Sequence, residues 1–471
     1  MTAFVRSVVV VLALAMICVR LVRATTPDGY YDPAWPGAGR FAFNGDNLAP
    51  ANASRGGAIF VESNGNLFLS GLAIGAKNYW WLGELSPAGT FVSTFGANGA
   101  GRITSCQLGF SCAADNTWHG SALAQPGTYL VVSNSLALTN QAAHSISTSV
   151  GNPVTVNDQN GWVVVAATTM QADGKVLAGG QGIYSISDST QRFGVARFTS
   201  GLASIDHSFN AITDTGGVTF DGGVIGSVDN TDTSETVGSV LVRPDGRIVL
   251  IGIGVNAVSN ASSLELMQLN ADGSPDATFG SNGVSKLHTF SSVIMTNVSA
   301  VLDRAGRLLV VVWVPSDFNG HSYATLIGTD GKEIWSVAAG PASAGCVSGG
   351  FATSAAFDSA GRVLIAGTCH ASLDQASGYY FFVQRYRGST GALDGSFGNN
   401  SVSLGGYADG STADLGNAMV LDSGGRPLVL GATFTLPSVQ ARSGVARLTY
   451  DLVYTNDFET VPRGCLPPDC N

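Results

Sequence analysis

The feature that most constrains the fold of this 471-residue chain is an internal repeat. Its clearest copy runs from Val240 to Val284 with the sequence VLVRPDGRIVLIGIGVNAVSNASSLELMQLNADGSPDATFGSNGV. One turn glycine of each copy can be aligned, with an average spacing of about 60 residues, at Gly65, Gly127, Gly174, Gly246, Gly306, Gly361 and Gly425. A repeat of this length indicates an array or ring in which each unit packs against its neighbours.

Each unit predicts four short antiparallel strands. In the clearest copy, the apolar segments Val237–Val242 and Arg247–Ile251 flank an Asp-Gly turn, and Leu264–Leu269 precedes a second one at Asp272–Gly273. A tight hairpin connection needs Gly because the backbone there takes positive φ. Four such strands form the blade of a β-propeller, and nearly continuous apolar runs such as IVLIG fit strands covered on both faces. We therefore predict an all-β protein, a β-propeller of seven four-stranded blades, with six or eight blades as alternatives.

The two ends of the chain predict how the ring closes. Pro27–Arg40 matches the end of a repeat unit, with Trp35 in the place of the repeated Phe, while the last unit stops after Gly444–Asp451. The N-terminal segment would therefore supply the missing outer strand of the last blade and remove exposed sheet edges. We expect Tyr30–Trp35 to lie beside Gly444–Thr449.

The repeats resemble those of the delta-60 repeat family of bacterial exported proteins. Units of that family look like DGK-hydrophobic-G, then a strand ending in ARY or ARF, then DGSLDTSFG, and the matching segments here are Asp173–Phe209, Pro244–Gly280 and Ser359–Gly398. The unit around Gly127 is degenerate, and the one around Gly306 ends in VVVWV where a Gly is expected. The resemblance implies an exported propeller and no particular activity.

The first residues indicate export. Arg6 precedes an apolar run from Val8 to Val19, and Ala24 offers a small residue for cleavage, which is the pattern of a signal peptide. The run is too short to cross about 30 Å of hydrocarbon comfortably, although Arg20 and Arg23 leave an uncleaved anchor as the alternative. We predict a signal peptide at 1–24, a propeller at 25–455 and a C-terminal tail containing Cys and Pro at 456–471. The expected location is secreted, extracellular or at the cell surface, with the periplasm as an alternative.

The charge of the chain excludes some partners. Cleavage after residue 24 would remove three of the 23 Lys and Arg residues and none of the 33 acids, so that the formal charge becomes 20 − 33 = −13. An acidic surface disfavours nucleic acid and anionic membranes, since both attract clusters of Lys and Arg. We expect a monomer without a membrane span in the mature chain, and an extracellular protein or a glycan as partner.

Six cysteines remain after the predicted cleavage. They form three sequence-local pairs, and in an exported protein disulfides are the default interpretation. A metal site would favour CxxC spacing or interleaved His, which is the alternative. The predicted disulfides are Cys106–Cys112, Cys346–Cys369 and Cys465–Cys470.

Three pairs of opposite charges recur in the repeat. Arg197 with Asp206 and Arg385 with Asp394 share a nine-residue spacing, and ring closure would match Arg447 with Asp32. A buried Arg must be paired, so a contact that ties the third strand to the fourth segment explains the recurrence without catalysis. We predict structural ion pairs.

Metal ligation has only weak candidates. The insertion 209–235 contains acids that could gather around a cation, although a solvated loop is favoured because they are spaced irregularly; the candidates are Asp214, Asp221, Asp229 and Asp232, followed by Glu235. The segment NADGSPD (270–276) lacks the further acids of a calcium loop and predicts an ordinary turn. No cofactor is predicted, with calcium as the alternative.

The repeated unit carries no catalytic motif. The patterns GxSxG, HExxH and SxxK are absent, and no catalytic or cofactor-binding residue is predicted. The aromatic runs 79–81 and 379–382 are interpreted as core, with a sugar-stacking surface as the alternative. We favour a non-catalytic binding or interaction scaffold over the alternative, an extracellular hydrolase or lyase with a site in the central channel.

Overall fold

A computed structural model describes most of the chain between residues 29 and 450, and all structural statements below concern these residues. Among them there is no helix with the length and apolar character that a membrane span requires. The predicted signal peptide and C-terminal tail lie outside them. The described residues are 29–45, 53–74, 78–96, 99–108, 120–125, 128–132, 135–140, 146–151, 154–155, 162–183, 190–210, 212–213, 219–220, 222–291, 295–315, 321–341, 346, 350–370, 378–399, 401–408, 411, 413–434 and 441–450.

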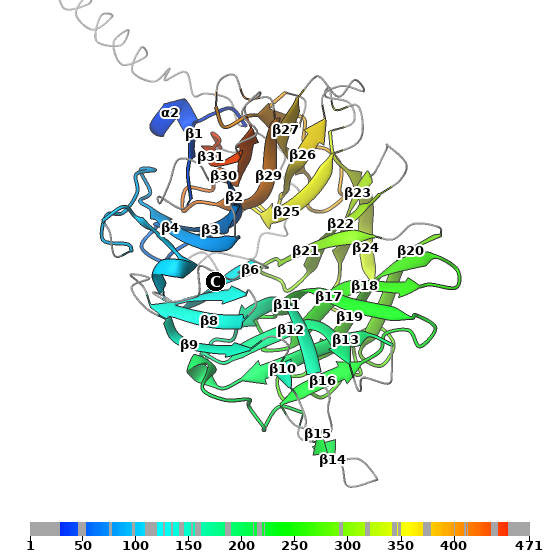
Figure 1. The fold of residues 1–471 in the computed structure, drawn as a ribbon. Coiled ribbons are helices and arrows are strands. Elements are labelled where there is room, and N and C mark those ends of the chain that lie inside the picture. The colour runs from blue at the N-terminus through cyan, green and yellow to red at the C-terminus, as the bar shows by residue number, and fades with distance from the viewer. Residues whose placement is uncertain are drawn as a thin grey trace, which may run out of the picture.

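The described residues form a β-propeller of seven four-stranded antiparallel blades (Figure 1). Blades 1 to 3 consist of β2 (Ala53–Val61), β3 (Leu67–Ile74), β4 (Tyr79–Leu85) and β5 (Arg102–Thr104); of β6 (Gly120–Gln125), β7 (Thr128–Val132), β8 (Ser135–Asn140) and β9 (Ile146–Gly151); and of β11 (Trp162–Met170), β12 (Val176–Ile183), β13 (Arg192–Phe198) and β16 (Gly223–Gly226). The short strand β10 (Val154–Thr155) pairs with β11, and β14 (Ile212–Thr213) and β15 (Thr219–Phe220) form a separate hairpin.

Blades 4 to 7 follow the same order along the chain. They consist of β17 (Ser234–Val242), β18 (Ile248–Asn256), β19 (Ala261–Leu269) and β20 (Val284–Ser291); of β21 (Thr296–Leu302), β22 (Leu308–Val314), β23 (His321–Ile327) and β24 (Glu333–Ala339); of β25 (Phe351–Phe357), β26 (Val363–His370), β27 (Tyr379–Tyr386) and β28 (Val402–Gly405); and of β29 (Ala413–Leu421), β30 (Pro427–Phe434), β31 (Ala441–Arg447) and β1 (Arg40–Phe43). Short helical turns occur at Pro36–Gly39, Ser105–Leu108 and Ser200–Leu202.

The first strands of the blades form a closed circle. Each of β2, β6, β11, β17, β21, β25 and β29 contacts the first strand of the next blade, and β29 contacts β2. Figure 1 shows the blades arranged around this circle in chain order, from blue to red. The prediction of an all-β propeller with seven blades is therefore confirmed.

The N-terminal segment closes the ring as predicted, but its strand lies later in the sequence than the predicted contact. β1 pairs with β31 in the antiparallel register Arg40↔Ala446. Tyr31 forms a β-bridge with Leu448, and the Asp32 N–H donates to the Arg447 carbonyl at 2.9 Å. Between these two points the chain makes a turn around Trp35, as the Asp-to-Phe segment does in other units, so the outer strand begins only at Arg40.

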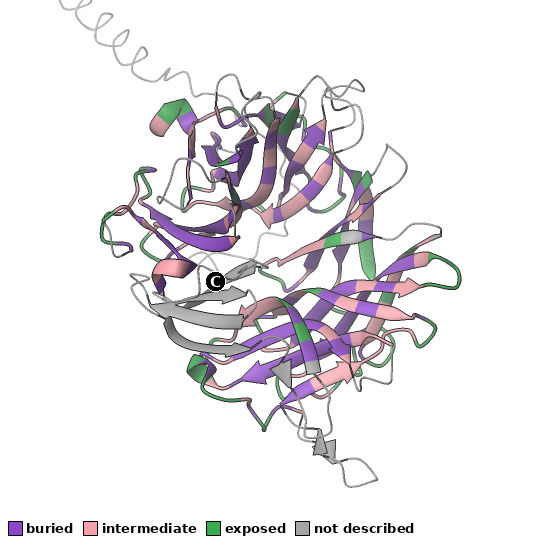
Figure 2. Ribbon diagram, in the orientation of Figure 1, coloured by how far each residue is buried: buried purple, intermediate pink, exposed green. Residues whose placement is uncertain are grey.

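The hydrophobic core consists of layers between neighbouring blades. One layer, for example, packs Val249, Ile251 and Leu266 of blade 4 against Val310 and Val312 of blade 5. Figure 2 shows such buried residues along the strands of the described blades. Strands covered on both faces account for the nearly continuous apolar runs in the repeat.

A repeated glycine has a steric function that the sequence does not reveal. Most first strands contain a β-bulge, and the glycine that ends each IVLIG-type run lies against the bulge. A Cβ at these positions would lie within 2.0 Å of a first-strand carbonyl oxygen, at Gly71, Gly180, Gly252, Gly367 and Gly431. In blade 5 the position is Val312, and the bulge is shifted to Asn297, which takes φ +56°. Asn tolerates this conformation better than most residues, so the fold persists without the glycine.

A buried ion pair, which we call the clasp, ties the third strand to the fourth segment of a blade. The Nε of Arg385 donates to Oδ2 of Asp394 at 2.6 Å, and the Nε of Arg197 donates to Oδ2 of Asp206 at 2.8 Å. In blade 7, Nη2 of Arg447 lies 2.9 Å from Oδ2 of Asp32, across the ring closure. All three pairs that the sequence predicts are thus in contact.

The clasp has further parts that recur between blades. The guanidinium group of Arg385 lies 5.0 Å from the ring centroid of Phe397, and that of Arg197 lies 4.4 Å from Phe209. In blade 4 a neutral amide replaces the guanidinium group, since Nε2 of Gln268 donates to Oδ2 of Asp276 at 2.6 Å. The basic residue after the Asp-Gly turn supplies the positive charge there, with Nε of Arg247 at 3.2 Å from the same oxygen.

Removing the guanidinium group of one clasp should destabilise the protein strongly. The side chain of Arg385 is 1% exposed, so Arg385→Met leaves a buried carboxylate without its partner. We expect the free energy of unfolding in urea to fall by about 3 to 5 kcal/mol. As a control, Lys332→Met removes a cation that is 80% exposed and should change it by less than about 0.5 kcal/mol. Equal effects of the two substitutions would contradict the structural role of the clasp.

The clasp should also make the protein sensitive to acid. Burial by itself would raise the pKa of Asp206, Asp276 and Asp394, but hydroxyl and amide hydrogen bonds and the facing cations lower all three below 3.8. The three aspartates therefore bind protons less readily in the native state than in the unfolded chain. Their contribution to stability is complete at pH values above their pKa in the unfolded chain. It is lost as the pH falls through their lower pKa values in the native state. Melting temperatures should drop between about pH 5 and pH 2, and less so for Asp394→Asn. A flat profile in this range would refute the expectation.

Candidate functional site

Four acidic side chains and one lysine converge at the start of blade 4, and we call them the acidic cluster. Asp229 and Asp232 lie in the connection that enters β17, and Glu235 is the second residue of that strand. Glu265 lies on β19 and Lys286 on β20. The structure thus places two of the predicted metal candidates, Asp229 and Asp232, in one site. Asp214 and Asp221 lie outside the described residues.

The strand register explains why these side chains meet. Glu235 pairs with Gly254, and Glu265 pairs with Lys286. A Cβ on Gly254 would lie 2.4 Å from the carboxyl group of Glu265, so the glycine leaves the space in which that group lies. Other blades have Gly194, Phe382 or Gly444 at the position of Glu265. Glu265 and Lys286 were not predicted as site residues from the sequence. The position of an acid within the apolar strand 264–269 could have indicated Glu265.

Lys286 is the central cation of the cluster. Its Nζ lies 2.7 Å from Oδ2 of Asp229, 2.9 Å from Oδ2 of Asp232 and 3.5 Å from Oε1 of Glu265. From blade 3, Nη1 of Arg192 donates to the main-chain oxygen of Asp232 at 3.0 Å. Lys286 therefore neutralises one of the carboxylates and leaves the cluster with an excess of negative charge.

Glu235 and Glu265 are held at one oxygen each. Oε1 of Glu235 accepts hydrogen bonds from Ser227 Oγ at 2.8 Å, from the Val228 N–H at 2.9 Å and from the Asp229 N–H at 3.0 Å. Oε1 of Glu265 accepts one from Ser263 Oγ at 2.9 Å. Among the described residues, Oε2 of either glutamate has no hydrogen-bond partner, although both side chains are fully buried.

This arrangement perturbs the acids in opposite directions. Burial raises the pKa of Glu265 to about 9, and the nearby Asp232 and Glu235 contribute to the rise, so its carboxyl group is protonated at neutral pH. Burial also raises the pKa of Glu235. The hydrogen bond from Lys286 instead lowers the pKa of Asp229. One carboxyl group is thus kept neutral because the local cations are too few.

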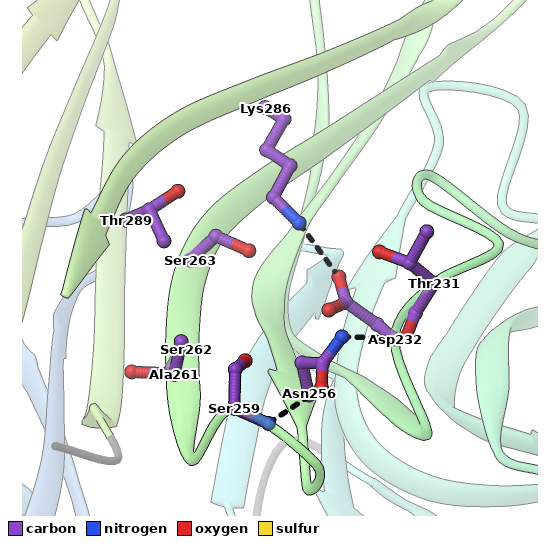
Figure 3. Close-up of a pocket in the computed structure, with 9 residues that line it drawn as sticks. All are labelled: Thr231, Asp232, Asn256, Ser259, Ala261, Ser262, Ser263, Lys286 and Thr289. Atoms are coloured by element: carbon purple, nitrogen blue, oxygen red, sulfur yellow. Dashed lines mark hydrogen bonds and ion pairs between the residues drawn. The ribbon is translucent and has the colours of Figure 1, made fainter. Parts of the chain in front are cut away.

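A small polar pocket opens beside the cluster (Figure 3). Its volume is about 280 Å³, and it is lined by Thr231, Asp232, Asn256, Ser259, Ala261, Ser262, Ser263, Lys286 and Thr289. Asn256 holds one wall in place, since its Nδ2 donates to the Thr231 carbonyl at 2.8 Å and its Oδ1 accepts from the Ser259 N–H at 3.0 Å. Of the cluster, only Asp232 and Lys286 line the pocket, while Glu235 and Glu265 lie behind its wall.

The other predicted residues take structural places where the structure describes them. A disulfide joins Cys346 and Cys369. Cys106 is disulfide-bonded, but its predicted partner Cys112 lies outside the described residues, as do Cys465 and Cys470. In the segment 270–276, Oδ1 of Asp272 accepts from the N–H and Oγ of Ser274, as expected of an ordinary turn.

The aromatic runs belong mainly to the core. Trp80, Trp81 and Phe382 are fully buried, whereas Tyr379 and Tyr380 are 45% and 39% exposed at the start of β27. The core interpretation therefore holds for the inner members of both runs. The exposed Tyr379 ring packs against His370 with ring centroids 4.6 Å apart.

Comparison with known proteins supports the fold. Residues 171–209 and 243–279 match the model of a family described as "Domain of unknown function (DUF5122) beta-propeller". No curated protein matches the chain. Both matched segments begin at an Asp-Gly turn region and end at the aromatic residue of a clasp, so the family model covers the part of the unit that recurs.

Solved propeller structures are similar at low identity. The polysaccharide lyase Uly1 is 12% identical, with 91% of this chain and 98% of that chain covered and a TM-score of 0.46. A PL25 ulvan lyase bound to -[GlcA(1-4)Rha3S]- is 10% identical, with coverages of 88% and 98% and a TM-score of 0.45. The α-L-arabinanase of Penicillium chrysogenum complexed with arabinobiose is 11% identical, with coverages of 87% and 98% and a TM-score of 0.36.

The contact between Lys286 and Asp232 should stabilise the fold when no divalent cation is present. In a chelator, we expect Lys286→Met to lower the free energy of unfolding in urea by about 1 to 3 kcal/mol, less than for a fully buried pair because the lysine side chain is 30% exposed. In a double-mutant cycle with Asp232→Asn, the coupling should be about 1 kcal/mol or more. The exposed pair Lys332 and Asp330 provides the matched cycle, with an expected coupling below about 0.5 kcal/mol. Similar couplings in the two cycles would count against the cluster.

Proposed function

We propose that this chain is an exported, non-catalytic binding propeller that holds a small polyhydroxylated ligand, of the size of a sugar residue, in the pocket of blade 4. The observation that carries this proposal is the pocket lining, which combines hydroxyl and amide groups with one Asp–Lys pair. Such groups match the donors and acceptors of a sugar. The repeats are, on this proposal, delta-60 repeats of the exported bacterial type.

The position of the acids favours binding over hydrolysis. A glycosidase needs two carboxyl groups on opposite sides of the scissile bond. Here Asp232 is the only acid among the lining residues, and Glu265 lies behind the wall, out of contact with a ligand in the pocket. The lining comes from the second, third and fourth strands of the blade and from the connection that enters it, so the pocket is away from the central circle of first strands.

Two further observations support export. The first 24 residues have the pattern of a cleaved signal peptide. The disulfide between Cys346 and Cys369 is typical of proteins outside the reducing cytosol. We accordingly propose a secreted or surface-exposed monomer with a glycan as its partner.

Sugar binding can be tested with the chain that begins at Thr25. Titration with glucose, galactose, rhamnose and glucuronate, followed by calorimetry or ligand-observed NMR, should find at least one ligand with Kd near 1 mM, which corresponds to about −0.3 kcal/mol for each of about 12 non-hydrogen atoms. Thr289→Trp should abolish the binding because the indole fills the pocket.

The matched control is Thr390→Trp, which adds the same side chain at an exposed turn in blade 6 and should leave the affinity unchanged. Release of reducing sugar from oligosaccharides, if it were abolished by Thr289→Trp, would replace the binding proposal with the hydrolase alternative. Affinity that is unchanged in Thr289→Trp would place the ligand elsewhere.

A further inference from the structure

We propose that Asp232, Glu235 and Glu265 form a calcium site behind the pocket of blade 4, with Lys286 as the cation that balances their charge when calcium is absent. The inference does not depend on the ligand of the pocket. It depends on the geometry of the three carboxyl groups, on an unpartnered oxygen of Glu235 and on the access that the pocket provides.

The spacing of the carboxyl groups suits a single ion. One oxygen from each of Asp232, Glu235 and Glu265 can be chosen so that all three lie within 4.8 Å of one another. Two calcium–oxygen bonds of about 2.4 Å span up to about 4.8 Å, so one calcium ion can contact all three oxygens. Oxygen donors alone suit calcium, magnesium and manganese rather than softer metals. Calcium accepts irregular geometry, whereas magnesium demands a near-ideal octahedron and releases its water reluctantly, so a site built from three side chains favours calcium.

A buried oxygen independently indicates a missing positive partner. Glu235 is fully buried, and in the described part of the chain its Oε2 has no hydrogen-bond partner. A buried acceptor without a partner is unfavourable, and more so when it is charged. Because Ser227 and two backbone N–H groups hold Oε1 of Glu235, the orientation of its second oxygen is set in advance.

Lys286 shows that a cation is accommodated at this place. Its Nζ already contacts Asp232 and Glu265, yet it carries one charge where a divalent ion would supply two. The side chain extends from the outer strand β20, is 30% exposed and borders the pocket, so it can move aside without rearrangement of the sheet. Calcium takes six to eight oxygen ligands, and water in the pocket would complete the set.

Among the described residues, such a group of three acids occurs in blade 4 alone. It uses an acid at the Glu265 position, where blades 3, 6 and 7 have Gly or Phe. The connection 227–233 brings Asp232 close to Glu265 of β19 and to Lys286 of β20. The clasp of blade 4, by contrast, keeps the repeated aspartate at Asp276 and differs from the other clasps in Gln268. A feature that differs between units is where a repeat fold places binding, because the repeated residues are needed for packing.

Calcium binding can be measured on the chain that begins at Thr25 after treatment with a chelator. Calcium chloride should give saturable binding by calorimetry with a stoichiometry near one and should raise the melting temperature, since a ligand of the native state stabilises it. Magnesium chloride should bind at least about tenfold more weakly, because magnesium demands near-ideal octahedral geometry and releases its water reluctantly. No saturable calcium binding would overturn the proposal.

Substitutions then test the residues. Glu265→Gln should weaken calcium binding at least about tenfold, because an amide replaces a carboxylate ligand of the ion. The amide has nearly the size and shape of the carboxyl group, so the protein should stay folded. Lys286→Met should tighten calcium binding at least about threefold, since the competing cation is removed. If Lys286 contributed only to the stability of the fold, its removal would not increase the affinity for calcium. Asp330→Asn, at an acid that is 55% exposed, is the matched control and should leave the affinity unchanged.

The outcomes separate this site from the sugar pocket. Calcium affinity that is unaffected by Glu265→Gln, or equally reduced by Asp330→Asn, would show surface binding only and reject the site. Calcium binding that follows the expected pattern in a protein without affinity for sugars would support the site and reject the proposed function. Sugar binding in the presence of the chelator, together with no calcium binding, would support the proposed function and reject the calcium site.

Discussion

The buried ion pair between the third strand and the fourth segment is the interaction on which the rest of this propeller depends. Each outer segment of blades 3, 6 and 7 is held by an Arg–Asp contact at 2.6 to 2.9 Å, and blade 4 uses Gln268 with help from Arg247. Burial makes an unpaired charge unfavourable, so both partners are required wherever one is present. In blade 7 the same contact joins Arg447 to Asp32, and the two ends of the chain close the ring through it.

An unpaired buried charge is equally unfavourable in the acidic cluster, but there the charges are balanced in a different way. In the clasp each buried carboxylate faces a cation, and the pKa of Asp206, Asp276 and Asp394 is lowered. In the cluster one lysine faces four acids, and burial together with the neighbouring acids raises the pKa of Glu265, so that its carboxyl group stays neutral. Perturbed acids of this kind gather at functional sites more often than in packing contacts. The contrast between the two arrangements separates the proposed binding site from the structural framework in this chain.

Much of the fold could be predicted because its signals are local in the sequence. Gly246 and its counterparts mark turns that need positive φ, apolar runs mark strands, and the nine-residue spacing of Arg385 and Asp394 marks the clasp. The site could be predicted only in part. Asp229 and Asp232 stand in a visibly acidic insertion, whereas Glu265 and Lys286 are single charges within strands, and their meeting depends on the register of β19 with β20.

The sequence by itself therefore determined the architecture and that the two ends of the chain meet, because the same strand and turn pattern recurs in most units. It favoured seven units but left six or eight open, and the structure shows seven. Only the tertiary structure decided which charges share a site. Glu235, Glu265 and Lys286 belong to three strands, and Gly254 leaves room for the carboxyl group between them. Hydrogen-bond register and the bulges decide which side chains of neighbouring strands meet, and the contact between particular charged residues of different strands leaves no pattern along the chain.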